Sequence, residues 1–345
     1  MKKTLGKVLV LVLSLAMLFS VPIAADAADE PLEFTFTCAQ AAAAGTPGAN
    51  LFDNFVRLVD EKSNGTIKCN FLAAGSVVST EREATEAIQV GTVDVVQVSD
   101  MGIDSVIGGC LGWAWLPYTV TSYEQVDELY NGGWMHDEIV RMMEENGIIK
   151  IANTENGFRQ VGNVKHEILD PDDFSGLKIR TPEIKELLRF YELNGALSVA
   201  IAASETLTAI SQGTIDGVDN TLLNLQAQGL LDALPYITIT NHIYSGGSII
   251  ANPDFWNGLT DEQRTIIEEA AVEAGNIHIQ ESRELEAALM TPEGIEEAGY
   301  SYQIAQVTPE LDAALREYAM QVWEEFGDQY DPDCMQKIMD EFGTK

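Results

Sequence analysis

Two segments of this chain, far apart in sequence, share one helix-to-strand pattern. Residues 86–94 (Glu-Ala-Ile-Gln-Val-Gly-Thr-Val-Asp) resemble residues 208–216 (Thr-Ala-Ile-Ser-Gln-Gly-Thr-Ile-Asp). In both, a helical stretch ends at a glycine, which takes the left-handed conformation at a helix end without the steric cost of a Cβ atom. The repeat predicts two similar lobes, and a cleft between two lobes is a place where small ligands bind. A chain of 345 residues also exceeds the usual size of a single core.

The order of elements in the first half predicts an α/β fold. Strands are expected over residues 32–38, 66–72 and 92–98, with helices over 49–62 and 79–90 between them. Because strand–helix–strand crossovers are right-handed, these helices should cover the faces of a mainly parallel sheet.

The second half repeats this arrangement and then becomes mostly helical. Its expected strands are 148–154, 158–161 and 214–218, and its expected helices are 182–193 and 205–212. An extended segment over 236–251 is long enough to run between the lobes. Amphipathic patterns predict further helices over 260–288, 309–326 and 334–342.

Residues 1–27 have the features of a secretory signal peptide. Lys2, Lys3 and Lys7 form a positively charged start, residues 8–21 are apolar, and Ala25-Asp26-Ala27 is a small-residue cleavage site. We expect cleavage after Ala27 and a periplasmic location, with simple secretion as the alternative.

The chain is strongly acidic, with 20 Lys and Arg against 54 Asp and Glu and a formal net charge of −34 at pH 7. Removal of residues 1–27 takes away three lysines and one aspartate, which gives −34 − 2 = −36. A field of this sign argues against nucleic acid or anionic lipid as a partner. It also repels anionic ligands, so a site for an acid must depend on local contacts.

Two arginines stand in short apolar runs rather than on charged helix faces. Arg159 lies in residues 157–160 (Gly-Phe-Arg-Gln), and Arg180 lies in residues 176–182 (Gly-Leu-Lys-Ile-Arg-Thr-Pro). A guanidinium is always charged, and its planar fork fits a carboxylate. We therefore expect a pocket that binds an organic acid. The alternatives are a surface ion pair for either arginine and, for Arg159, an ion pair at a hinge or between lobes.

Together with three further segments, these motifs resemble a known family. Residues 116–118 (Leu-Pro-Tyr), 157–160, 176–182, 212–220 (Gln-Gly-Thr-Ile-Asp-Gly-Val-Asp-Asn) and 240–242 (Thr-Asn-His) stand in the order found in extracytoplasmic solute-binding proteins of TRAP transporters. The resemblance implies a two-lobed, periplasmic-binding-protein-like α/β fold whose lobes are joined by crossing strands and a long helix. It also implies closure on a carboxylate-bearing solute, which could be a uronate, a dicarboxylate, a 2-oxo acid or a similar acid, and delivery to a sodium-coupled membrane permease.

The same resemblance assigns lobes and residues. Residues 28–156 and 246–285 would form lobe I, and residues 157–245 and 286–345 would form lobe II. Matching positions in the motifs imply three ligand contacts, with Arg180 as the main partner of the solute carboxylate, Arg159 as a second arginine and Asn220 as an amide contact. A turn following the strand is the alternative role for Asn220, and His242 is expected to be a structural histidine.

Gln40, Glu81 and Ser99 are the ligand candidates of the first lobe. Each lies at or near the C-terminal end of an expected strand, where open α/β sheets bind ligands. The chain also departs from the family pattern, with Thr221 at a position where proline is common and Ala203 where an aromatic is common. These smaller residues favour a bulkier or less polar acid.

Four cysteines, Cys38, Cys69, Cys110 and Cys334, allow three complete disulfide pairings. Cys38 and Cys69 fall in strands that should be neighbours, which makes them the best candidate pair. Buried free thiols are the favoured interpretation.

Other functions receive less support from the sequence. It contains no nucleophile elbow, phosphate loop, dinucleotide fingerprint or His-Glu-x-x-His helix. Asp216 and Asp219 could form the acid/base pair of a periplasmic lyase or isomerase, although their spacing gives no reason for them to converge. A binding protein of an ATP-driven importer is the closer alternative. We expect a monomer that is not an enzyme, without cofactor or metal.

Overall fold

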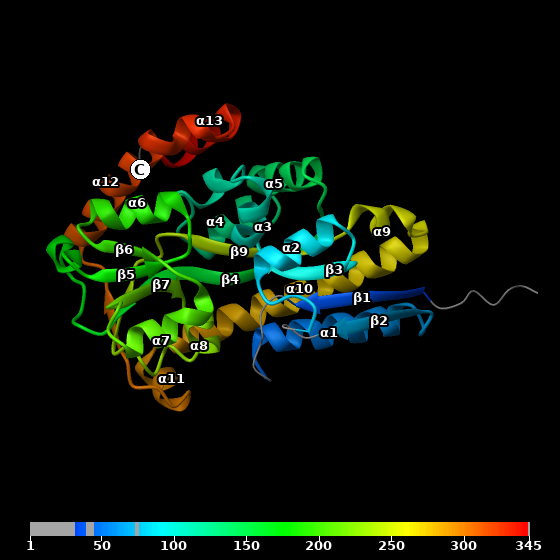
Figure 1. Cartoon of the computed structure of the whole chain (residues 1–345), viewed down its shortest axis with the longest axis horizontal. Helices are drawn as coiled ribbons and strands as arrows, with labels where there is room; N and C mark the ends of the chain where they lie inside the picture. The colour runs from blue at the N-terminus through cyan, green and yellow to red at the C-terminus, as the bar shows by residue number, and fades with distance from the viewer. Residues whose placement is uncertain (1–31, 39–44, 73–75, 344–345) are drawn as a thin grey trace, which may run out of the picture.

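The computed structural model describes residues 32–38, 45–72 and 76–343 as two lobes (Figure 1). The expected signal peptide and Gln40 lie outside these ranges. Within them, none of the helices combines the length and the apolar character that a membrane crossing requires.

A single ten-stranded mixed sheet passes through both lobes. Its main path has the order β2-β1-β3-β9-β4-β7-β5-β6, and β8 joins β10 to β4. The parallel strands of lobe I are β1 (Leu32–Cys38), β2 (Ile67–Leu72) and β3 (Val95–Ser99), and those of lobe II are β5 (Lys178–Thr181), β6 (Leu197–Ala200) and β7 (Gly217–Thr221). The parallel pair β8 (Tyr236–Ile239) and β10 (Gln303–Gln306) completes lobe II.

Two long antiparallel strands cross between the lobes, as the family resemblance implied. Strand β4 (Ile149–Asn163) pairs with β9 (Tyr244–Ala251) from Ile149 opposite Ala251 to Phe158 opposite Tyr244. The prediction of two separate strands over 148–154 and 158–161 was therefore wrong. The chain continues through the intervening residues with a register shift between Glu155 and Gly157, because pairing with β9 holds it extended where the local sequence favours a turn.

Helices cover both faces of this sheet (Figure 1). Those of lobe I are α1 (Pro47–Lys62), α2 (Glu81–Gln89), α3 (Asp100–Ile107), α4 (Tyr123–Gln125), α5 (Trp134–Glu145) and α9 (Pro253–Gly258). Lobe II carries α6 (Lys185–Leu193), α7 (Thr206–Ser211), α8 (Leu222–Ala227), α11 (Pro292–Glu297) and α12 (Pro309–Phe326).

The long helix α10 (Asp261–Leu289) runs along both lobes (Figure 1). Thr260 and Gln263 start it with a capping box, in which each side chain accepts a hydrogen bond from the backbone N–H of the other. The helix packs on α1 in lobe I, on the crossing strand β4, and on α8 and α11 in lobe II. It is therefore a second structural link between the lobes.

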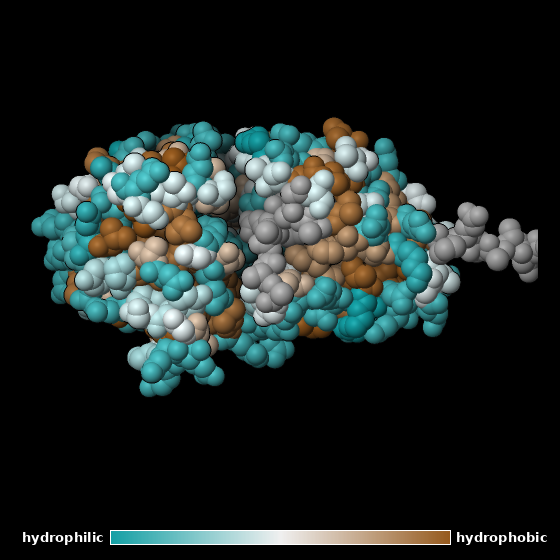
Figure 2. Space-filling view, turned by 60° about the horizontal axis from the view of Figure 1, so that its bottom comes forward, coloured by the Kyte–Doolittle hydropathy of each residue, from teal (hydrophilic) through white to brown (hydrophobic). Residues whose placement is uncertain are grey.

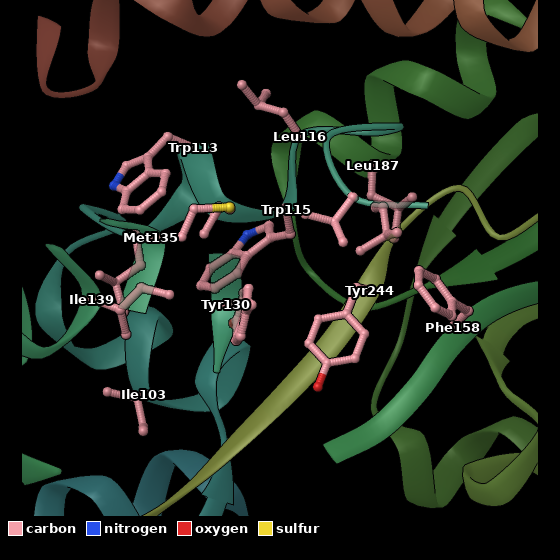
Figure 3. Packing of buried hydrophobic residues seen from close by; sticks show 14 of the residues in the cluster. Ile103, Trp113, Trp115, Leu116, Tyr130, Met135, Ile139, Phe158, Leu187 and Tyr244 are labelled. Atoms are coloured by element: carbon pink, nitrogen blue, oxygen red, sulfur yellow. The ribbon is translucent and has the colours of Figure 1, made fainter. Parts of the chain in front are cut away.

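The final helix, α13 (Pro332–Phe342), returns to lobe I. Its residues Lys337 and Glu341 contact α5, through an ion pair with Glu138 at 3.0 Å and a hydrogen bond from Trp134 Nε1 at 3.0 Å. A continuous apolar core lies under this contact and includes Tyr130 and Tyr244, whose rings meet edge to face at 4.9 Å (Figure 3).

The two copies of the sequence repeat have the same backbone geometry. Gly91 and Gly213 have φ values of +69° and +67°, as predicted for helix ends. Thr92 N donates to Ala87 O at 2.9 Å, and Thr214 N donates to Ala209 O at 3.0 Å. The repeat is thus one supersecondary unit used twice.

The predicted neighbours β1 and β2 are paired, but their register excludes a Cys38–Cys69 disulfide. Cys69 lies opposite Phe34, four residues away from Cys38 along β1. At about 3.3 Å per residue this offset is roughly 13 Å, about twice the Cα separation that a disulfide spans. Cys69 is a free thiol, as are Cys110 and Cys334. Burial raises the pKa of Cys69 to about 12.

Candidate functional site

Strands from the two lobes end near each other at the crossing strands. Ser99, the last residue of β3, pairs with Gly247 of β9, and Thr221, the last residue of β7, pairs with Arg159 of β4. Because β3 and β7 approach this point from opposite lobes, their carboxyl ends face the same region. The edge formed by such strand ends is the usual ligand-binding edge of an open α/β sheet.

Arg180, at the C-terminal end of β5, is buried with only 5% of its surface exposed. Its Nε and Nη2 atoms donate to the backbone oxygen of Ile201 at 3.0 and 2.8 Å. Among the residues that the structure describes, no carboxylate forms an ion pair with it. Burial and the nearby Arg159 lower the pKa of Arg180 to about 10, so it stays charged at neutral pH. A buried charge without a partner is costly, and an anionic ligand would remove that cost.

Arg159 has a carboxylate partner inside lobe II. Its Nε contacts Asp219 Oδ1, and its Nη2 donates to the backbone oxygen of Asp219 at 2.7 Å. Both side chains are buried. This ion pair holds the guanidinium at the end of β7, and the Nη1 atom of Arg159 donates no hydrogen bond to a described residue. Arg159 thus forms a buried ion pair between the paired strands β4 and β7, which differs from both the surface pair and the interlobe pair considered as alternatives.

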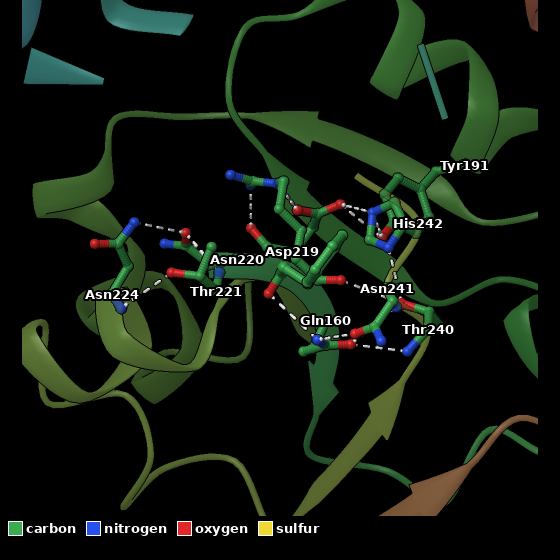
Figure 4. A network of polar contacts seen from close by, with 11 residues as sticks. Gln160, Tyr191, Asp219, Asn220, Thr221, Asn224, Thr240, Asn241 and His242 are labelled. Carbon is green, nitrogen blue, oxygen red and sulfur yellow. Dashed lines mark hydrogen bonds and ion pairs between the residues drawn. The ribbon is translucent and has the colours of Figure 1, made fainter. Parts of the chain in front are cut away.

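Asp219 is the centre of a buried polar network (Figure 4). Its Oδ2 accepts a hydrogen bond from Tyr191 Oη at 2.7 Å and contacts His242 Nε2 at 2.8 Å. Burial raises the pKa of Asp219, but the charge of Arg159 and the contact with His242 outweigh it and hold the pKa at about 2. Asp219 is therefore ionised and orients Arg159.

His242 is a structural residue, as predicted. Its Nδ1 contacts Thr240 Oγ1 at 2.8 Å, so both ring nitrogens have partners, and its ring stacks on Phe190. The adjoining loop is fixed by Gln160, whose Oε1 accepts hydrogen bonds from the backbone N–H groups of Thr240 and Asn241 (Figure 4).

Asn220 has the turn role that was considered as its alternative, and its contact with solute remains a prediction. Its Oδ1 accepts from Thr221 N at 2.9 Å and from Asn224 Nδ2 at 3.2 Å, so the oxygen does stabilise the turn into α8. Its Nδ2 donates to no residue in the described ranges. The amide is therefore held with its donor group available at the end of β7.

Glu81 and Ser99 of lobe I lie together. The backbone N–H and the hydroxyl of Ser99 donate to the two carboxylate oxygens of Glu81, each at 2.8 Å, and Ser99 Oγ also accepts from Gly102 N at 3.0 Å. Ser99 thus caps α3 in the way that Thr221 caps α8. A contact of Glu81 or Ser99 with solute remains a prediction.

A cavity of about 590 Å³, part of it open to solvent, adjoins this region. Figure 2 shows a furrow between the two lobes on one face of the molecule. The cavity is lined from both lobes and from α10, by Thr46, Pro47, Gly48, Phe52, Gln97, Glu155, Asn156, Leu223, Asn224, Gln226, Ala227, His278, Ser282 and Leu285. Asn224 connects it to Asn220, which directly follows Asp219, the partner of Arg159.

None of these cavity residues was predicted from the sequence. A signal existed for Gln97, the only polar residue in the interior of the Val-rich strand β3, and for Asn224, one helical turn after Asn220. No comparable signal marks His278 and Ser282, because their place beside the site depends on how α10 packs across both lobes. Among the described residues, no group of His, Cys, Asp and Glu side chains could hold a metal ion.

Comparison with known proteins places the chain in a family. The sequence profile of bacterial extracellular solute-binding protein family 7 (DctP) matches residues 38–329. The C4-dicarboxylate-binding protein DctB of Bacillus subtilis (strain 168) is 29% identical over 267 residues, which cover 77% of this chain and 73% of that protein. The C4-dicarboxylate-binding periplasmic protein DctP of Rhodobacter capsulatus is 29% identical over 263 residues, 76% of each chain.

Solved structures share the fold. A TRAP periplasmic solute-binding protein from Ochrobactrum anthropi superposes with a TM-score of 0.80 at 26% identity, covering 91% of this chain and 96% of that one. The sugar acid binding protein DctPAm from Advenella mimigardefordensis, solved with galactonate, has a TM-score of 0.80 at 21% identity and covers 90% of this chain and 97% of that one. With its profile match and its two-lobed fold, the chain belongs to bacterial extracellular solute-binding protein family 7, the extracytoplasmic receptors of TRAP transporters.

Proposed function

We propose that this protein binds a small organic acid between its lobes and delivers it to a TRAP-type, sodium-coupled membrane permease. In this proposal the solute carboxylate is held by Arg180, with further donors from Arg159 and Asn220. The observation that carries it is the buried guanidinium of Arg180, which has no carboxylate partner among the described residues and donates only to a backbone oxygen.

In this proposal the crossing strands supply the hinge. Gly157 has a φ of +89° and follows the register shift in β4, at the expected boundary between residues 28–156 of lobe I and residues 157–245 of lobe II. Closure about this point would bring lobe I, with Glu81 and Ser99, onto a solute held by lobe II. Such hinge motions are the usual closure mechanism of two-lobed binding proteins.

The family is extracytoplasmic, and the proposed location of this member is the periplasm, after cleavage behind Ala27. The acidic chain would remain soluble there, while a field of this sign gives no affinity for nucleic acid.

Binding without chemistry is the second part of the proposal. Asp216, one of the two carboxylates considered for acid/base catalysis, accepts a hydrogen bond from Lys178 N at 3.1 Å and pairs with Lys165. Asp219 is held by Arg159, Tyr191 and His242. Both carboxylates therefore have structural partners, which supports binding without chemistry.

A thermal-shift screen of organic acids tests the function. A ligand present at 100 times its Kd should stabilise the protein by about 2.7 kcal/mol, whereas the corresponding primary amide, which lacks the carboxylate charge, should not. NMR of the bound acid over hours should show no product. Stabilisation by amides and acids alike, or conversion of the acid, would contradict the proposal.

A further inference from the structure

We infer that the solute has a single carboxylate and that the rest of it is uncharged and carries hydrogen-bonding groups. This inference rests on the proposed function and narrows its substrate class. It distinguishes monocarboxylates with a neutral polar tail from the dicarboxylates named for two relatives of this chain.

The buried charges of Arg159, Arg180 and Asp219 sum to one positive charge, which balances one solute carboxylate. Two guanidinium groups, those of Arg159 and Arg180, lie near each other, but the carboxylate of Asp219 is already paired with Arg159. One positive charge is therefore left to balance a ligand. A second carboxylate would need another cation elsewhere in the cleft, because an unpaired carboxylate is expensive to bury.

The cavity wall beyond Asn224 does not supply that cation. Neither lysine nor arginine is among the described residues that line it. The internal segments outside the described ranges, residues 39–44 and 73–75, consist of alanine, glutamine and glycine, so they contribute no basic side chain either.

Arg283 of α10 contacts the lining residue Glu155, but this cation has two carboxylate partners. It hydrogen-bonds both carboxylate oxygens of Glu155, at 2.9 and 3.1 Å, and both of Asp127, at 2.9 and 2.7 Å. Glu155 also lines the cavity, so the guanidinium of Arg283 is already engaged at this wall. His278 also lines it, and burial lowers the pKa of this histidine, which keeps the imidazole neutral at pH 7.

The polar groups that line the cavity near Asn224 are mainly neutral amides and a hydroxyl. Gln97, Asn224 and Gln226 present side-chain amides to the cavity. Ser282 is 1% exposed, and its hydroxyl oxygen has no hydrogen-bond partner among the described residues. Phe52, Leu223 and Leu285 supply apolar surface between these groups. A wall of this kind suits hydroxyl or carbonyl groups on a short carbon skeleton.

Pairs of acids that differ only in the charge of the far end provide the test. Isothermal titration would compare succinate with succinamate, glutarate with glutaramate, and galactarate with galactonate. In each pair with measurable binding, the monocarboxylate should bind at least tenfold more tightly. Equal or tighter binding of the dicarboxylates would overturn the inference and leave the proposed function standing. Absence of binding by acids throughout a broad screen would overturn both.

A charge introduced into the wall provides an independent test. Gln226 lines the cavity, and its side chain makes no hydrogen bond to a described residue, so Gln226→Lys should fold normally. It should raise the affinity for the dicarboxylate of a pair relative to the monocarboxylate by about tenfold, while the uncharged control Gln226→Met should leave the ratio unchanged. An unaltered ratio in a folded Gln226→Lys protein would contradict the placement of the solute tail in this cavity.

Discussion

Asp94 and Asp216 occupy equivalent positions in the two lobes and make equivalent contacts. Asp94 Oδ2 accepts from the backbone N–H of Thr35 in β1 at 2.7 Å, and Asp216 Oδ2 accepts from that of Lys178 in β5 at 3.1 Å. Their backbone oxygens accept, each at 2.9 Å, from Asn252 and Val164, which directly follow the crossing strands β9 and β4. Each aspartate directly precedes a central strand, β3 or β7, and hydrogen-bonds the backbone of the chain in or next to both neighbouring strands. This shared role explains why the sequence repeat ends in Asp.

Replacement of Asp219 should strongly destabilise the protein. Asp219→Ala leaves Arg159 buried without its carboxylate, and breaking a buried pair in this way costs about 3–5 kcal/mol. Urea denaturation of the variant measures this loss. The exposed Asp232→Ala serves as control and should change the free energy of unfolding by less than about 0.5 kcal/mol. A loss for Asp219→Ala as small as that of the control would show that the network is not structural.

Glu286 should make the protein less stable as the pH rises. It is a buried residue of α10 beside Gly157, and it contacts the hydroxyl of Tyr123. Burial raises its pKa from 4.5 to about 7. Between pH 4.5 and 7 the folded state therefore retains a proton that the unfolded state has lost. The resulting loss in the free energy of unfolding is absent below pH 4.5, grows between pH 4.5 and 7, and is complete above pH 7.

The variant Glu286→Gln should remove this dependence. At pH 8 it should be more stable than the natural sequence by up to about 3 kcal/mol, and the difference should shrink toward pH 4.5. Urea denaturation across this pH range measures the difference, with the exposed Glu284→Gln as control. A constant difference between variant and natural protein at every pH would contradict the assignment to Glu286.

Alanine substitutions at Gly157 and Gly213 compare two positions of positive φ. An added Cβ atom is crowded by a neighbouring side chain at the first position only. Both have positive φ, at +89° and +67°. A Cβ atom on Gly157 would lie 2.8 Å from Glu286 Oε1, whereas a Cβ on Gly213 would meet nothing within 4 Å. Gly213→Ala should cost about 1–2 kcal/mol from backbone strain alone. Gly157→Ala should cost more and should also alter solute affinity, because Gly157 lies at the proposed hinge. Equal costs in denaturation, together with unchanged affinity, would count against the hinge.

Much of the fold follows from local patterns. The helix ends at Gly91 and Gly213, the α/β order and the long helix that begins after Thr260 all depend on residues close in sequence. The single strand β4 was missed because Asn156-Gly157 looks like a turn, and only pairing with the distant strand β9 keeps the chain extended there. The register that separates Cys69 from Cys38 is likewise set by long-range pairing.

The candidate site was predictable in part. The apolar surroundings of Arg159 and Arg180 indicated buried guanidinium groups, and both are buried. Asp219 could not be predicted as the ion-pair partner of Arg159, because nothing in its local sequence distinguishes it from the many other carboxylates of this acidic chain. Ser282 and His278 were beyond prediction because α10 places them beside the cleft through contacts with both lobes.

The central claim is that Arg180 holds the solute carboxylate, and titration calorimetry of Arg180 variants with an acid found by screening tests it most directly. Arg180→Ala should weaken binding by about 3–5 kcal/mol, more than a hundredfold in Kd. Arg180→Lys, which keeps the charge but loses the planar fork, should give an intermediate loss. Lys165→Ala, far more exposed and paired with Asp216, should bind as the natural protein does. An unchanged Kd for a correctly folded Arg180→Ala protein would contradict the account.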